Sequence, residues 1–174
     1  MIEDSAVQAS NAKSAYESRP WLKHYPSYIQ PEITTQFSNG LEMFLKTVKA
    51  MPDQRAIYYF DRPISYSELD RQSSALAAVL KERGVTKGDR VALYLQNIPQ
   101  FLIGLYGTWK VGAIVVLCNP MFKQRELEYH LNDSGSKGLI CLESLYETYG
   151  RNAVGNTKVE FVITTNELDM LGEE

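Results

Sequence analysis

The central part of the chain alternates between long segments with the apolar spacing of helices and short segments that are almost wholly apolar. Three segments of each kind occur between Tyr66 and Ile140. Such alternation is typical of a parallel sheet, because helices cover both faces of each strand. The pattern predicts an α/β fold with a doubly wound, mostly parallel sheet and helices on both faces.

Four apolar segments are the predicted strands of this sheet: residues 91–95, 113–118, 139–142 and 159–163. We expect the first two to be buried on both faces, because no polar residue interrupts them. Ligands of doubly wound sheets lie off the carboxyl ends of the strands. Any binding site is therefore expected near Leu95–Asn97, Cys118–Pro120 and Leu142–Ser144.

The helices are predicted from their apolar stripes and end signals: residues 41–51, 65–84, 99–111, 124–132 and a short piece at 145–149. Ser65 and Glu68 have the spacing of a capping box, and Gly84 is expected to end that helix. Gly104 and Gly107 are three residues apart, which predicts a helix face that packs closely on the sheet.

The residues before this region divide into three predicted parts. Residues 1–18 are expected to form a mobile tail, and residues 19–35 an extended aromatic and proline-rich arm, because prolines 20, 26 and 31 disfavour helix. Residues 36–174 are expected to form a partial amino-terminal α/β domain. Within it, residues 56–60 and 64–66 are predicted to form a hairpin that turns at Asp61–Pro63.

The charge of the chain argues against a nucleic-acid partner. The net charge is −3, and lysine and arginine are dispersed rather than gathered on one face. The first residues are polar and include Glu3 and Asp4, unlike a signal peptide, so we expect a cytoplasmic protein. Residues 101–118 are read as a helix and a strand rather than a membrane span, because Lys110 and Gly112 interrupt them.

No residue of the chain is predicted to be catalytic or to bind a metal. Cys118 and Cys141 lie in apolar segments and are expected to be buried free thiols, while His24 and His130 are expected to be ordinary surface histidines. Neither glycine-rich phosphate motif is present. Residues 134–138 resemble a phosphate loop in composition only, because they follow a helix and precede a strand.

Three stretches of the sequence together resemble the amino-terminal region of adenylate-forming (AMP-binding) acyl-CoA synthetases: "ISYSELDRQSSALAAVLKERGVTKGDRVALYLQN", "PQFLIGLYGTWKVGAIVVLCNP" and "RELEYHLNDSGSKGLI". The segment "RPWLKHYPSYIQP" further resembles the leader of the long-chain fatty-acid CoA ligases. The resemblance covers almost everything from Arg19 to Ile163.

The resemblance implies a ligase of fatty-acid metabolism that uses ATP and Mg²⁺ to form an acyl-adenylate and then transfers the acyl group to coenzyme A. The family's phosphate loop and its other ATP-site residues lie downstream of the region matched here. The chain is therefore expected to be an amino-terminal fragment that is inactive alone and binds none of these cofactors strongly. Fatty acid and coenzyme A are the implied partners of the full-length enzyme, and a homodimer through the arm and peripheral membrane contact are compatible with it.

One candidate site residue follows from the resemblance. The loop after the strand that matches Gly138–Leu142 can lie near the adenosine phosphate of coenzyme A in acyl-CoA synthetases, and Arg151 falls there. A guanidinium suits a phosphate, although a solvated arginine is the simpler account. Two other functions stay open: a free-standing α/β binding or oligomerisation module, or another acyl- or aryl-CoA ligase.

Overall fold

A computed structural model describes residue 14 and residues 16–171. The chain divides into two units, residues 1–38 and residues 39–174, which we describe separately. Most of the predicted tail, residues 1–13 and 15, lies outside the described residues.

The described part of the first unit contains one short helix, η1, a 3₁₀ helix at Pro20–His24. The prediction of an extended arm is therefore wrong at these residues. Pro20 stands at the start of η1, where the missing backbone donor costs nothing and the fixed φ of proline favours helical geometry. Trp21, Tyr25 and Tyr28 are 38%, 44% and 80% exposed, so all three side chains are at least partly open to solvent.

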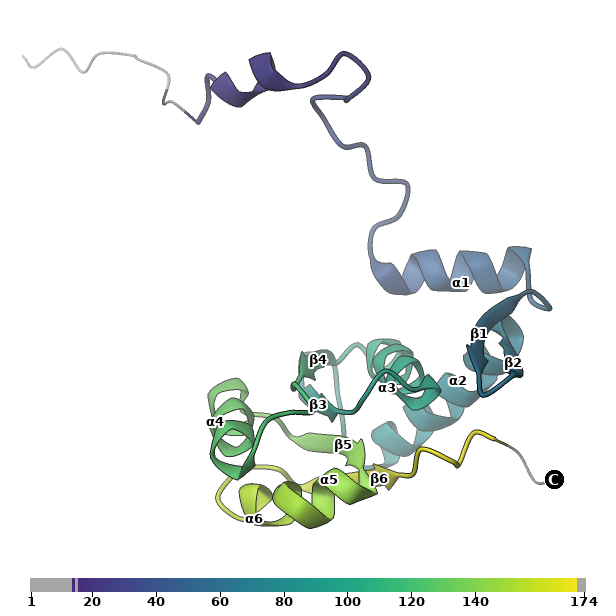
Figure 1. Ribbon diagram of the computed structural model, residues 1–174, viewed down its shortest axis with the longest axis vertical. Coiled ribbons are helices and arrows are strands. Elements are labelled where there is room, and N and C mark those ends of the chain that lie inside the picture. Colours follow the sequence, from purple (N-terminus) through teal and green to yellow (C-terminus); the bar gives the residue numbers. More distant parts are fainter. Residues whose placement is uncertain (1–13, 15, 172–174) are drawn as a thin grey trace, which may run out of the picture. The chain divides into compact units, whose positions relative to one another are not determined.

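The second unit is built on a sheet of four parallel strands in the order β4-β3-β5-β6. The strands are β3 (Arg90–Tyr94), β4 (Ile114–Leu117), β5 (Gly138–Leu142) and β6 (Phe161–Thr165). Helices α2 (Tyr66–Glu82) and α3 (Pro99–Lys110) cover one face. The other face is covered by α4 (Gln124–Ser134) and by a helical run of α5 (Glu143–Leu145), the π-helical η2 (Tyr146–Gly150) and α6 (Arg151–Val154). Figure 1 shows these two layers, and the predicted doubly wound fold is confirmed.

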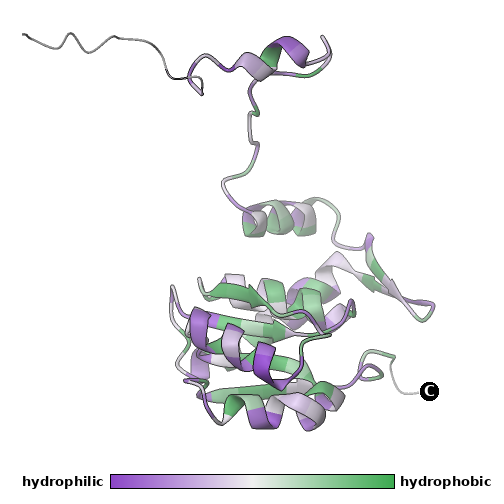
Figure 2. Ribbon diagram, turned by 60° about the vertical axis from the view of Figure 1, so that its left-hand side comes forward, coloured by the Kyte–Doolittle hydropathy of each residue, from purple (hydrophilic) through white to green (hydrophobic). Residues whose placement is uncertain are grey.

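Strand β3 shows how the sequence fills both layers. Val91 and Leu93 point to the α2–α3 side, where they pack with Leu80. Ala92 and Tyr94 point to the opposite side, because successive side chains of a strand alternate. These four residues of β3 are completely buried, as predicted for a central strand. Figure 2 shows the same layering, with mostly hydrophobic strands between helices that also carry hydrophilic residues.

A helix and a hairpin complete this unit. Helix α1 (Gly40–Ala50) stacks Phe44 on Tyr106 of α3, with ring centroids 3.8 Å apart. Strands β1 (Arg55–Tyr59) and β2 (Arg62–Ser65) pair antiparallel and contribute Ile64 to the same apolar cluster. The predicted hairpin is confirmed, but its turn lies at Phe60–Asp61, both with positive φ, so only Asp61 of the predicted turn Asp61–Pro63 is in it. Pro63 instead lies within β2.

Three further predictions need correction. Strand β4 is the edge of the sheet rather than a buried strand, and Ile114 and Leu117 are 53% and 60% exposed. Gly107 faces α2 rather than the sheet, because a Cβ there would lie 3.1 Å from the Ser73 carbonyl oxygen. Only Gly104 approaches the sheet, at Leu93. Strand β6 begins at Phe161, two residues later than expected.

The predicted helix boundaries hold in most places. Ser65 caps α2 by accepting a hydrogen bond from the Glu68 backbone N–H at 3.1 Å. The Glu68 carboxylate does not complete the capping box and instead accepts hydrogen bonds from Arg62 and Gln72. Gly84 follows α2 with a φ of +76°. Helix α3 ends at Lys110 and β4 begins at Ile114, which confirms that residues 101–118 form two elements.

Candidate functional site

The carboxyl edge of the sheet is organised by side chains that come from β3 and from the start of α3. The Tyr94 hydroxyl donates a hydrogen bond to the Phe122 carbonyl oxygen, which fixes the loop after β4 to the end of β3. Burial raises the pKa of Tyr94 to about 12, so the hydroxyl stays protonated and can only serve as a neutral donor here. This contact was not predicted, because a strand tyrosine carries no signal of its loop partner.

Gln100 joins the start of α3 to the end of β6 across the same edge. Its amide nitrogen donates to the Thr165 hydroxyl at 3.1 Å and to the Asn166 carbonyl oxygen at 2.8 Å. The Asp169 carboxylate then accepts from the Thr165 hydroxyl and from the Asn166 backbone N–H. These bonds hold the segment after β6 against α3.

Two pockets lie along this part of the molecule. The first, of about 320 Å³, is bounded by β1 and by the start of α3 and includes Asn97. The second, of about 470 Å³, lies on α4 and is lined by Phe122, Arg125, Glu126, Tyr129 and His130. His130 stacks on Phe122 with ring centroids 4.6 Å apart, and Glu126 caps α4 by accepting from the Lys123 backbone N–H. Of the three predicted strand ends, only Leu95–Asn97 contributes to these two pockets, through Asn97; the other lining residues were not predicted.

Arg151, the one site residue inferred from the sequence, begins α6 and is 62% exposed at its side chain. Its guanidinium lies 2.5 Å from the Glu147 carboxylate and 5.8 Å from the centroid of the Tyr146 ring. An exposed ion pair one helical turn apart is weak, and it leaves the remaining guanidinium donors available to an anion. The arrangement is compatible with phosphate binding and does not require it.

Cys118 and Cys141 are both buried and unpaired, as predicted. Burial raises the pKa of the Cys118 thiol to about 11 and that of Cys141 to about 12. Thiols with such values carry almost no thiolate at neutral pH, so neither is a nucleophile.

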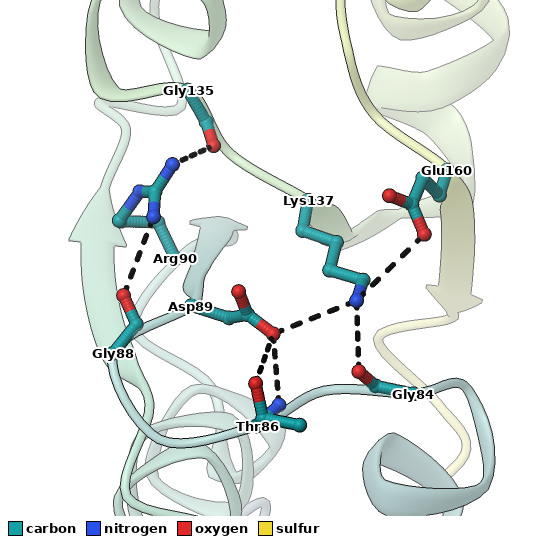
Figure 3. A network of polar contacts seen from close by, with 8 residues as sticks. All are labelled: Gly84, Thr86, Gly88, Asp89, Arg90, Gly135, Lys137 and Glu160. Atoms are coloured by element: carbon teal, nitrogen blue, oxygen red, sulfur yellow. Dashed lines mark hydrogen bonds and ion pairs between the residues drawn. The ribbon is translucent and has the colours of Figure 1, made fainter.

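The amino edge of the sheet is occupied by structural contacts (Figure 3). The Lys137 ammonium donates to the Gly84 carbonyl oxygen at 2.8 Å and pairs with Asp89 at 3.5 Å and with Glu160 at 3.9 Å. Arg90 donates to the carbonyl oxygens of Ser134 and Gly135, at the end of α4. Residues 134–138 thus end α4 and form the turn before β5, as predicted. The Lys137 ammonium contacts the loop before β3 and the loop before β6.

Within the described part of the chain, no three acidic, histidine or cysteine side chains gather into a set that could hold a metal ion. In the residues that the structure covers, no helix is long and apolar enough to cross a membrane.

Comparisons with known proteins identify the family. The family model described as "AMP-binding enzyme" matches residues 44–173. Long-chain-fatty-acid–CoA ligases of Escherichia coli O6:H1 and Yersinia pestis are 35% and 37% identical over 153 residues, 87% of this chain and 27% of each relative. The chain therefore spans about a quarter of the length of these relatives.

Solved structures agree with this match. A long-chain-fatty-acid-CoA ligase from Archaeoglobus fulgidus is 27% identical, with a TM-score of 0.68 over 81% of this chain and 29% of that one. A benzoate CoA ligase from Burkholderia xenovorans has a TM-score of 0.69 at 17% identity, over 76% of this chain and 27% of that one, which shows the fold alone. The parallel sheet, its two helical layers and the family match over most of its length show that the chain belongs to the AMP-binding enzyme family.

Proposed function

We propose that this chain forms the amino-terminal part of a long-chain fatty-acid CoA ligase. The observation that carries the proposal is the match to fatty-acid ligases over 87% of the chain, which includes most of the sheet and the helices on both of its faces. The reaction would join a fatty acid to AMP with release of pyrophosphate and then pass the acyl group to the thiol of coenzyme A.

Within this reaction, we propose that the chain contributes structure and part of the substrate surface rather than the adenylating groups. Phosphoryl chemistry of this kind depends on donors aimed at the developing charge. Lys137 and Arg90, two cations next to glycine turns, are engaged by main-chain oxygens at the amino edge. The 174 residues alone are therefore expected to release no pyrophosphate.

The test is a coupled pyrophosphate assay with ATP, Mg²⁺, coenzyme A and a set of acids that includes palmitate, octanoate and benzoate. It should be run on this chain and on the longest reading frame that contains it. We expect turnover with palmitate from the longer polypeptide and none from the 174-residue chain. Preference for benzoate would favour an aryl-CoA ligase, and no turnover by either would favour a binding module.

We also propose that Arg151 binds the adenosine phosphate of coenzyme A. Its guanidinium is exposed, and its present partner, Glu147, is an exposed carboxylate that a phosphate with a higher charge could displace. Titration calorimetry with coenzyme A and with dephospho-coenzyme A separates the phosphate contact from the rest. Arg151→Ala should abolish any preference for coenzyme A, and Glu147→Gln should increase it.

The matched control is Arg71→Ala, an exposed arginine on α2, which covers the opposite face of the sheet. Equal affinities for the two nucleotides in the unaltered chain would contradict this role for Arg151.

A cytoplasmic location and peripheral membrane contact both stay predictions, and fractionation of cells that produce the protein would test them.

A further inference from the structure

A third pocket lies where the carboxyl-terminal parts of α2 and α3 meet the loop before β3. Its volume is about 690 Å³, larger than the two pockets described above and within the usual size of sites for small ligands. Its lining comes from residues 77–81 of α2, from residues 85–87 of the loop, and from Lys110 and Val111 at the end of α3. The pocket therefore lies at the amino ends of β3 and β4, at the opposite end of β3 from Asn97.

The charge of this lining is entirely positive. Three of its residues are lysines, Lys81, Lys87 and Lys110, and none is acidic. Asp70 neutralises Lys110, since its carboxylate lies 2.6 Å from the ammonium. Lys81 and Lys87 are exposed, and among the residues that the structure describes neither side chain forms an ion pair or a hydrogen bond. The pocket therefore offers two unpaired ammonium groups to a ligand.

The inner part of the pocket is apolar. Val85 is only 3% exposed and belongs to the core cluster beneath α2 and α3, and Val111 packs against the same cluster. Ala77 adds a small, partly buried side chain from α2. Because these apolar groups are recessed, they suit the body of a small molecule better than a flat lipid surface.

The loop that carries Lys87 is held by hydrogen bonds and by packing. Thr86 donates to the Asp89 carboxylate through its backbone N–H at 2.8 Å and its hydroxyl at 3.0 Å (Figure 3). The Gly88 backbone N–H donates to the Gly112 carbonyl oxygen at 3.0 Å. The Lys87 stem passes close to Gly112, where a Cβ would lie 3.3 Å from the Lys87 Cγ. Since the loop is already fixed, binding costs the freedom of the lysine side chains rather than that of the backbone.

We infer that this pocket binds a small phosphate monoester whose organic part is apolar. A phosphate monoester carries nearly two negative charges at neutral pH, and lysine ammonium groups bind phosphate as point charges. Lys81 and Lys87 would hold the phosphate, and the organic part would lie on Val85 and Val111. The lining contains no carboxylate that would repel the anion. Such a site goes beyond the proposed ligase reaction and would exist whichever acid the longer polypeptide activates.

The experiment titrates the 174-residue chain with phenyl phosphate at low ionic strength and about pH 7.5, above the second pKa of the ligand. Calorimetry gives the affinity, and amide shifts in ¹⁵N spectra should change saturably at residues 77–87 and 110–112. Phenyl phosphate should bind at least about tenfold more tightly than methyl phosphate, because its ring buries more apolar area. Phenol, which lacks the charge, should show no saturable binding. Added salt should weaken the binding of phenyl phosphate, because it screens the lysines.

The variants test the two unpaired lysines. Lys81→Gln and Lys87→Gln should each weaken binding at least about tenfold, because each removes a hydrogen bond between charged groups. Lys158→Gln is the matched control, since Lys158 is an exposed lysine outside the lining and its loss changes the net charge equally. Arg151→Ala separates this pocket from the coenzyme A contact proposed above. Both controls should bind phenyl phosphate as the unaltered chain does.

Four results would overturn the inference. These are the absence of saturable binding, shifts centred on other residues, equal affinities for phenyl phosphate and methyl phosphate, and equal binding by the unaltered chain and the two lysine variants of the pocket. An equal loss in Lys158→Gln would also overturn it, because the anion would then respond to net charge alone. A loss in Arg151→Ala would place the phosphate on the other face of the sheet and would contradict the assignment as well.

Discussion

Lys110 is the residue that ties α2 to α3 most directly. Its ammonium lies 2.6 Å from the Asp70 carboxylate and 2.8 Å from the hydroxyls of Ser73 and Ser74, and its side chain is only 13% exposed. Lys110→Met should lower the free energy of unfolding by about 1–3 kcal/mol, because it removes hydrogen bonds to a charged donor. Urea denaturation measures this.

The control is Lys46→Met, which breaks an exposed ion pair with Glu42 on α1 and should change stability by less than about 0.5 kcal/mol. Equal losses of unfolding free energy in the two variants would show that the shielded position of Lys110 adds nothing to stability.

Asp89 makes stability depend on pH. Hydrogen bonds from the backbone N–H and the hydroxyl of Thr86 lower the pKa of its carboxyl, with a smaller contribution from Lys137. A lowered pKa stabilises the fold at pH values above the unfolded pKa, about 3.9, and this stabilisation is lost as the pH falls through the folded value. Asp89→Asn should therefore be less stable than the unaltered chain at pH 7, with the difference shrinking toward pH 3. A difference that is the same at both pH values would refute this assignment.

At the scale of the elements, α2 and α3 approach each other closely at Gly107. A Cβ there would lie 3.0 Å from Leu76 and 3.1 Å from the Ser73 carbonyl oxygen. Gly107→Leu should cost about 1–3 kcal/mol through overpacking, despite the better helix propensity of leucine. Thermal unfolding monitored by circular dichroism measures the change. Val79→Leu, at a 40% exposed position of α2, should be neutral or slightly stabilising. An increased midpoint for Gly107→Leu would contradict the observed packing.

The elements also show where sequence reasoning works. The strands of the sheet and the helices that cover it were predictable because the spacing of apolar residues agrees with the residues that begin and end helices, such as Pro99 and Gly84. The exposure of β4 was not predictable, since an apolar strand has the same sequence pattern at the centre of a sheet and at its edge. Phe60 in a turn with positive φ was missed because bulky residues rarely adopt that conformation. The lining of the first pocket was missed because it joins residues 40 positions apart through tertiary packing alone.

At the scale of the whole molecule, the first unit predicts self-association. Trp21, Tyr25 and Tyr28 present large apolar rings to solvent, which favours contact with another surface. We expect a homodimer that becomes a monomer when residues 1–31 are deleted, measured by multi-angle light scattering. Aggregates that persist after the deletion would indicate association through the second unit, and a monomeric full chain at high concentration would exclude the arm as a dimer contact.

The open edge of β4 has a consequence for the association of the protein in solution. Its sequence, Ile114–Leu117, contains no charge and no proline, the two devices that commonly keep strand edges from recruiting other strands. Two of its side chains are more than half exposed. Pairing of two such edges is therefore a second route to association of the chain, beside the aromatic arm, and it should limit the concentration at which the protein can be stored or crystallised.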